Sequence, residues 1–115
     1  MTSSLFEPNT PLLSRYQGIE ELTRVTERSS VQTTTLDSLA SQVGEIDFLK
    51  MDVQGGELAV IEGAQKALGA VSVIETEVEF VPLYEQQPLF ADIDIALRLH
   101  PPNSRLAPPH NCGRS

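Results

Sequence analysis

The sequence has no tryptophan, a single cysteine and few aromatic residues, which make up 5% of its 115 residues. The lone Cys112 cannot form a disulfide within the chain, which favours a reducing compartment, so we expect a cytoplasmic protein. With so few aromatic side chains, the core must be largely aliphatic. The apolar fraction of 40% is ordinary for a globular protein. Length and composition therefore predict one folded domain.

Basic residues are also scarce, with 8 lysines and arginines against 16 acidic residues and a formal net charge of -8. This balance argues against binding to nucleic acid or to an anionic membrane surface. No apolar run reaches the roughly 20 residues of a membrane span. The first 11 residues have neither the basic nor the apolar segment of a signal peptide. We therefore expect no nucleic-acid partner and no membrane association.

Several catalytic motifs are missing as well. The chain contains no G-x-G and no P-loop. Both histidines, His100 and His110, lie in a tail that also holds Cys112 and four of the eight prolines. A histidine-based triad or zinc site is therefore not expected. We predict that residues 100–115 are disordered, and the abrupt change in composition raises the hypothesis that this tail is not the natural end of the domain.

The remainder of the chain shows a succession of short elements. Residues 1–18 are predicted to be a loop with a helical turn over 12–16, and residues 22–27 and 31–35 are predicted to be two short strands. A helix is expected over residues 36–43, with Thr35 as its N-cap and Gly44 at its end. Prolines in 79–90 indicate a loop, and a last helix is expected over 92–99.

The central segment predicts a strand–helix–strand unit. Residues 46–51 form an apolar run, 56–68 carry a helical stripe that Gly69 ends, and 71–77 are rich in valine and isoleucine. Such a crossover places the two strands parallel. The nearly continuous apolar run of 46–51 is typical of a strand covered on both faces. The sequence therefore predicts an α/β fold.

Charged residues gather where these strands end. Asp52 follows the first strand, and Glu75 and Glu77 end the second. Since ligands of open α/β sheets bind beyond the carboxyl ends of the strands, these acids are candidate site residues. Lys50 is predicted to share a face with Phe48, and a lysine there needs a carboxylate partner or access to water.

Each of these candidates also has a purely structural interpretation. Lys50 can form an ion pair with Asp47 or Asp52 instead of serving a site. Gly55-Gly56 permits a sharp turn, and Glu57 lies in the first helical turn, where its charge is favourable by roughly 0.3–1 kcal/mol. Glu57 is thus either a helix cap or a site residue. Tyr84 lies between two prolines and either lines a substrate pocket or packs the loop.

Three stretches together resemble a known family. They are "TTTLDSL", "IDFLKMDVQGGELAVIEGAQKAL" and "VIETEVEFVPLYEQQPLFADI", and they resemble the FkbM family of S-adenosylmethionine-dependent methyltransferases. The pattern there is T-x-L-D-x-L, then I-D-x-x-K-x-D-x-x-G-x-E with a later G-A, then a strand ending in glutamate and a P-L-Y stretch. The resemblance covers about residues 3–97.

The resemblance implies a partial Rossmann-like, class I methyltransferase sheet with flanking helices. It implies oxygen methylation of a small hydroxyl compound such as a sugar or polyketide, with S-adenosylmethionine as the methyl donor. Asp52 would be the general base or the ligand of a divalent metal, and Lys50 would orient it. Glu57, Glu75, Glu77 and Tyr84 would line the substrate site.

The chain departs from the family pattern, because the glycine loop, the acid that grips the ribose of the donor and the usual strands after the last helix are all missing. Residues 1–99 thus resemble the C-terminal part of such a domain. We expect an incomplete sheet of this kind to leave an edge strand and an apolar face exposed. Three functions stay open: a methyltransferase, an inactive remnant that dimerises through the open sheet edge or docks on a partner, and a small-molecule binding module that uses the acidic strand ends.

Overall fold

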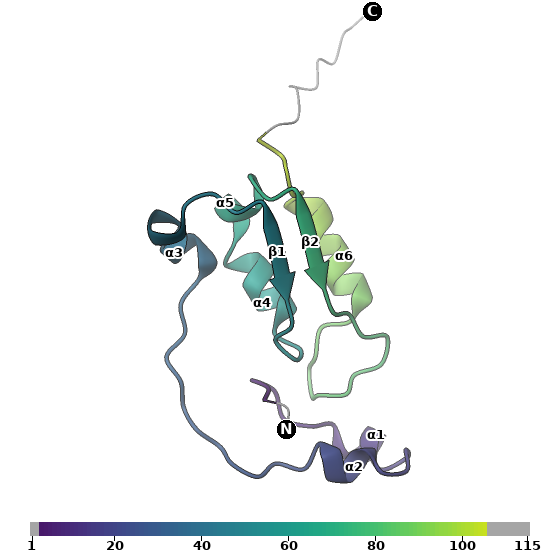
Figure 1. The fold of residues 1–115 in the computed structure, drawn as a ribbon. Helices are drawn as coiled ribbons and strands as arrows, with labels where there is room; N and C mark the ends of the chain where they lie inside the picture. Colours follow the sequence, from purple (N-terminus) through teal and green to yellow (C-terminus); the bar gives the residue numbers. More distant parts are fainter. Residues whose placement is uncertain (1–2, 106–115) are drawn as a thin grey trace, which may run out of the picture.

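The computed structural model describes residues 3–105 of the chain. Two parallel strands form the sheet, and α4 and α6 lie against one face of it (Figure 1). This arrangement confirms the predicted α/β class and is consistent with part of a Rossmann-like methyltransferase fold. The elements in chain order are α1 (Thr10–Leu13), α2 (Ile19–Leu22), α3 (Leu36–Val43), β1 (Phe48–Met51), α4 (Glu57–Glu62), α5 (Gln65–Leu68), β2 (Val73–Thr76) and α6 (Phe90–Leu99).

The predicted parallel pairing is confirmed. β1 and β2 lie in register from Phe48 opposite Val73 to Met51 opposite Thr76, so Lys50 faces Glu75. The chain between them runs through α4 and α5, as the crossover rule requires. Both strands therefore deliver their carboxyl ends to the same edge.

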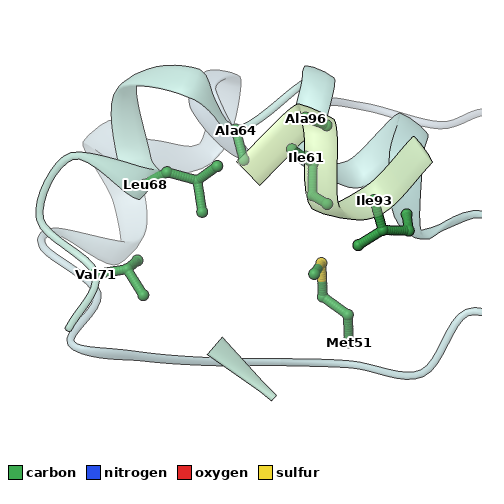
Figure 2. Close-up of a cluster of buried hydrophobic side chains, with 7 residues drawn as sticks. All are labelled: Met51, Ile61, Ala64, Leu68, Val71, Ile93 and Ala96. Atoms are coloured by element: carbon green, nitrogen blue, oxygen red, sulfur yellow. The ribbon is translucent and has the colours of Figure 1, made fainter. Parts of the chain in front are cut away.

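The core lies between the sheet and its helices. One face of β1 supplies Met51, which meets Ile61 of α4 and Ile93 of α6 (Figure 2). The cluster is almost entirely aliphatic, as the scarcity of aromatic residues predicts. Its other buried members are Ala64, Leu68, Val71 and Ala96.

The opposite face of the sheet is open. Phe48 and Val73 are 54% and 53% exposed, and Lys50 and Glu75 beside them are exposed too. The prediction that β1 is covered on both faces is therefore wrong, because among residues 3–105 helices cover only the face of Met51. The expectation that an incomplete sheet exposes an apolar face is confirmed.

The predicted helix over 56–68 is two helices, which is a correction. The break falls at Gly63-Ala64, between α4 and α5. The Gly63 carbonyl accepts from the backbone amide of Asp37, and the Asp37 carboxylate accepts from the amides of Lys66 and Ala67 at 2.9–3.1 Å. These bonds let a new helix begin at residue 65. They also hold α3 against α5.

Position 63 lies so close to the side chain of Thr35 that it requires glycine. A Cβ there would lie 3.0 Å from the side chain of Thr35. Thr35 also caps α3 as predicted, because its hydroxyl accepts from the Ser38 amide at 3.2 Å. Gly44 ends α3 with a φ of 72°, also as predicted. The T-x-L-D and G-A parts of the sequence pattern thus meet in one structural joint.

The predicted strands at 22–27 and 31–35 are wrong. Residue 22 belongs to α2, and residues 24–35 form an irregular connection that leads to α3 (Figure 1). β-rich composition alone cannot make a strand, because a strand needs a hydrogen-bonded neighbour. Within the described part of the chain none pairs with this segment.

The two ends of the described chain are both tied to the centre. Asn9 caps α1, its amide donates to the Leu83 carbonyl at 2.9 Å, and Pro8 bridges to Tyr84. At the other end, the amide of Asn103 donates to the carbonyl of Leu68, the last residue of α5, and the amide of Arg105 donates to the carbonyl of Gly69. The rest of the predicted tail, from residue 106 on, lies outside the described residues.

The last helix, α6, begins two residues earlier than predicted, because the Asp92 carboxylate accepts from the Leu89 amide at 2.8 Å.

Candidate functional site

Acidic side chains converge beyond the carboxyl ends of β1 and β2. The negative charge of Asp52 raises the pKa of Glu77, and burial together with the charges of Glu57, Glu77 and Asp52 raises the pKa of Glu79. Such mutual effects require the carboxyl groups to lie close together. The predicted meeting of Asp52 and Glu77 at one edge therefore holds. Both are exposed, so a ligand can reach them from solvent.

Glu79 is the member of this group that the sequence interpretation missed. It continues the alternation of Glu75 and Glu77 by two residues. The predicted strand ends at residue 77, which leaves Glu79 in the predicted loop. The period-two spacing of the three glutamates was the signal that could have included it.

Lys50 has a partner different from either one predicted. Its Nζ forms an ion pair with Glu75 Oε1 at 2.6 Å, whereas Asp52 acts on Lys50 only through its charge. The register explains this, because residues directly opposite on paired strands bring their side chains together. The bond to Glu75 raises the pKa of Lys50. The pair is exposed on the open face of the sheet, just before the acidic group.

The double glycine forms the turn that carries Asp52 into α4. Gly55 has a φ of 101°, and Gln54 before it also has a positive φ of 50°. This backbone conformation favours glycine, and a Cβ on Gly55 would also lie close to the side chains of Phe6 at 3.3 Å and Gln87 at 3.4 Å. The Gln54 side chain donates to Asp52 Oδ1 at 2.8 Å, which fixes the orientation of that carboxylate.

The buried side chain of Glu57 holds this turn through two hydrogen bonds. It is 3% exposed, and its two carboxylate oxygens accept from the amides of Val53 and Gly55 at 3.1 and 3.0 Å. A carboxylate that receives backbone amides at a helix start satisfies groups that would otherwise be unpaired. Both amides belong to the turn that precedes α4, so Glu57 holds that turn with both oxygens occupied and neither bond caps the helix itself.

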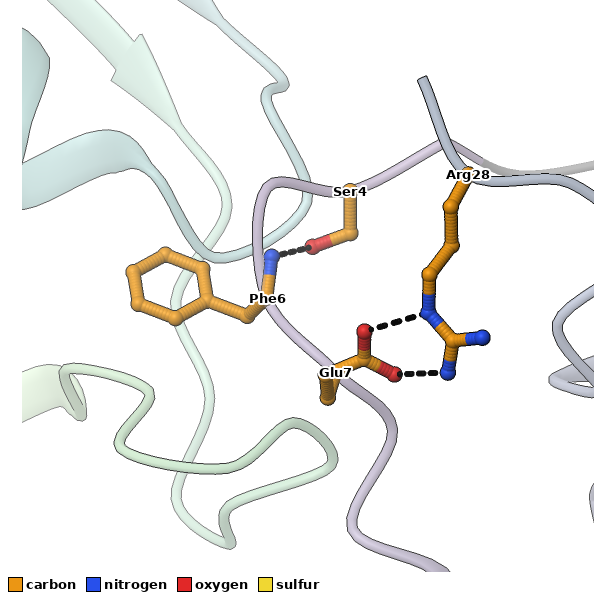
Figure 3. A network of polar contacts seen from close by, with 4 residues as sticks. All are labelled: Ser4, Phe6, Glu7 and Arg28. Carbon is orange, nitrogen blue, oxygen red and sulfur yellow. Dashed lines mark hydrogen bonds and ion pairs between the residues drawn. The ribbon is translucent and has the colours of Figure 1, made fainter. Parts of the chain in front are cut away.

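The N-terminal segment covers the turn, which is not among the predictions from the sequence. The Ser4 hydroxyl donates to the Gln54 carbonyl at 2.6 Å and accepts from the Phe6 amide at 3.0 Å. Figure 3 shows this serine beside Phe6, whose ring points toward the turn, and Glu7, which is paired with Arg28. A serine in a loop carries no signal that distinguishes such a long-range bond from simple solvation.

Two buried side chains complete this side of the turn. Tyr84 is 8% exposed, in the position expected of a tyrosine that packs its loop. Gln87 is 6% exposed, and its Oε1 accepts from the Tyr84 amide at 3.1 Å. Its Nε2 has no partner among the described residues, which makes it the least satisfied polar group beside Gly55.

A family model for the methyltransferase FkbM domain matches residues 3–113, almost the whole chain. The chain belongs to this family. No curated protein matches it, and no solved structure does.

Within this FkbM domain the family pattern divides into two structural roles. Thr35, Asp37 and Gly63 join α3 to the α4–α5 break, far in sequence from the strand ends. Asp52, Gly55 and Glu57 instead build the acidic edge and its turn.

Metal binding finds no support in the arrangement of these acids. Among residues 3–105 no group of three histidine, cysteine or acidic side chains is placed to hold a metal ion.

The described part of the chain also contains no helix that is long and apolar enough to cross a membrane.

Proposed function

We propose that this FkbM domain serves the transfer of a methyl group from S-adenosylmethionine to an oxygen of a small hydroxyl compound. The observation that carries the proposal is the group of Asp52, Glu77 and Glu79 beyond the carboxyl ends of the parallel strands. That edge is where open α/β sheets bind their ligands. Family membership supports the reaction class.

The acids suit one part of the donor in particular. Repulsion from Asp52 raises the pKa of Glu77, and burial together with repulsion from its acidic neighbours raises the pKa of Glu79, so a cation placed among these acids would relieve the repulsion. The donor carries its reactive methyl group on a positively charged sulfur. The residues present therefore fit the sulfonium, whereas the chain contains no G-x-G loop for the nucleoside.

Asp52 is the proposed general base. As the acceptor oxygen forms its bond to the methyl carbon, the bond from that carbon to sulfur breaks, and the hydroxyl proton passes to Asp52. The carboxylate is exposed and is held by Gln54, so it can meet a substrate hydroxyl in a fixed orientation. We assign Lys50 a positioning role, because it is paired with Glu75 and its positive charge also acts on Asp52 and Glu77. Glu57, Glu75, Glu77 and Tyr84 remain our candidates for the substrate side of the site.

The test is a calorimetric titration of the full chain with S-adenosylmethionine and with S-adenosylhomocysteine, which lacks the positive charge, followed by transfer of a labelled methyl group to a panel of hydroxyl compounds. We expect tighter binding of the charged donor, and loss of that preference in Asp52→Asn. Removal of a general base should lower the transfer rate by about a hundredfold or more. Glu62→Gln, which removes an exposed carboxylate from α4, should change neither result. Absence of both binding and transfer in the parent chain would refute the proposal.

A second function is favoured by the open face of the sheet. Phe48 and Val73 are exposed beside each other, although parallel sheets are normally covered on both faces. We propose as the alternative that a second copy of the chain covers this sheet, through its face or its open edge, without catalysis. Light scattering at high concentration tests it: a dimer that Phe48→Lys converts to monomer supports the idea, and a strict monomer contradicts it.

We further propose a cytoplasmic location, for which the argument is the single cysteine of the sequence.

A further inference from the structure

A cavity of about 500 Å³ lies outside the acidic edge. Its walls come from the start of the chain, from α1 and from the segment that follows α2. The start of the chain is fixed there by the bonds of Asn9 to Leu83 and Pro82. The cavity is thus built from segments that are distant in sequence but joined by hydrogen bonds.

One wall carries charges that neutralise each other. The Arg28 guanidinium binds the Glu7 carboxylate through two parallel hydrogen bonds, of 2.9 and 3.0 Å (Figure 3). The bond from Arg28 lowers the pKa of Glu7. A forked pair of this kind is geometrically specific, and it anchors residue 28 to the start of the chain. It leaves no net charge on that wall.

The two other charged side chains of the cavity are different. Glu21 and Arg24 both line it, and within residues 3–105 neither takes part in an ion pair or side-chain hydrogen bond. No ion pair joins the two to each other. The cavity therefore offers one unpaired negative and one unpaired positive group at separate points.

The rest of the cavity lining is mixed, because Thr10 and Thr23 contribute hydroxyl groups and Pro8, Leu13 and Val25 contribute its apolar part. Leu13 is 1% exposed and supplies a buried base, and Pro8 and Val25 add to it. A guanidinium is suited to a carboxylate, and a carboxylate to an ammonium group. We propose that this cavity binds a small zwitterion, an α-amino acid with an apolar side chain. Its carboxylate binds Arg24, its ammonium group binds Glu21, and its side chain lies on Pro8 and Val25.

The proposal does not depend on methyl transfer, and its test is binding alone. The full chain is titrated by calorimetry with L-leucine, with isocaproate, which lacks the amino group, and with isoamylamine, which lacks the carboxylate. We expect saturable binding of L-leucine and affinities at least about tenfold lower for the two fragments, because each loses a charge-assisted bond.

Two variants and two controls assign the site. Arg24→Gln and Glu21→Gln should each weaken L-leucine binding about tenfold, and each should abolish the preference over the fragment that lacks the matching charge. Arg15→Gln and Glu27→Gln remove the same charges from exposed positions outside the cavity and should leave the affinity unchanged. Circular dichroism verifies that all four variants fold. Equal affinity for L-leucine and both fragments, no saturable binding, or unchanged affinity in both cavity variants would overturn the proposal.

Discussion

Replacement of Glu57 by glutamine tests whether this buried carboxylate holds the turn beyond β1. The carboxylate accepts two backbone amides, one on each oxygen. A glutamine side chain keeps one acceptor oxygen, but its amide nitrogen cannot accept the second bond. One amide therefore loses its partner inside the protein, and the other keeps only a neutral bond.

The expected cost follows from the strengths of these bonds. A hydrogen bond to a charged group contributes about 1.5–3 kcal/mol and a neutral one about 1 kcal/mol. Loss of the first bond and weakening of the second are partly offset, because the negative charge of Glu57 also repels Glu77 and Glu79. We expect Glu57→Gln to lower the free energy of unfolding by about 2–3 kcal/mol, a large share of the roughly 5–15 kcal/mol of a typical domain.

Urea denaturation followed by far-ultraviolet circular dichroism measures this change without the need for a tryptophan. Glu62→Gln is the matched control, because Glu62 is an exposed residue of the same helix and makes no side-chain bond among the described residues. The control should stay within about 0.5 kcal/mol of the parent. If Glu57→Gln is as stable as that control, Glu57 does not hold the turn and the structural interpretation is refuted.

Two further substitutions test the acidic edge and the joint between α3 and α5. Asp52 raises the pKa of Glu77 above 4.5, because the two negative charges repel each other. The contribution of Glu77 to the free energy of unfolding is therefore fully present below pH 4.5 and is lost as the pH rises through the folded-state pKa. Glu77→Gln should therefore raise the melting temperature at neutral pH and not at pH 4, whereas a gain at both pH values would exclude charge repulsion as the cause. Asp37→Ala removes the cap of α5 and should cost about 1–2 kcal/mol in urea denaturation, with Asp37→Asn intermediate; an unchanged midpoint would mean that the cap does not stabilise the joint.

The strand–helix–strand unit was predictable because its information is local. The apolar runs, the glycine at residue 69 and the acids at the strand ends are all properties of short segments, and the crossover rule adds the parallel direction. The cap of α3 by Thr35 follows in the same way, since capping joins residues three positions apart.

The errors arose where the structure depends on a distant partner. The break at Gly63 comes from Asp37, more than twenty residues away, and no helical periodicity reveals it. The partner of Lys50 was fixed by the register of β2, which a single strand does not contain. The segments 22–27 and 31–35 have strand composition, but no strand of residues 3–105 pairs with them.

The candidate site was predictable in outline only. Asp52, Glu75 and Glu77 follow from their place at the strand ends, whereas the contribution of Ser4 depends on a bond across fifty residues. The unpaired Glu21 and Arg24 could not be recognised either, because both look like ordinary surface charges until the cavity is known.

The covering of the turn by residues 4–9 gives the acidic edge its own local stability. This segment is attached by a few hydrogen bonds, from Ser4 to Gln54 and from Asn9 to the loop before α6, and it buries little of the aliphatic cluster. Segments held in this way open at a lower free energy than the core beneath them. The Gly55 turn can thus be uncovered while β1, β2 and their helices stay folded, so access to the turn is an equilibrium separate from that of global unfolding.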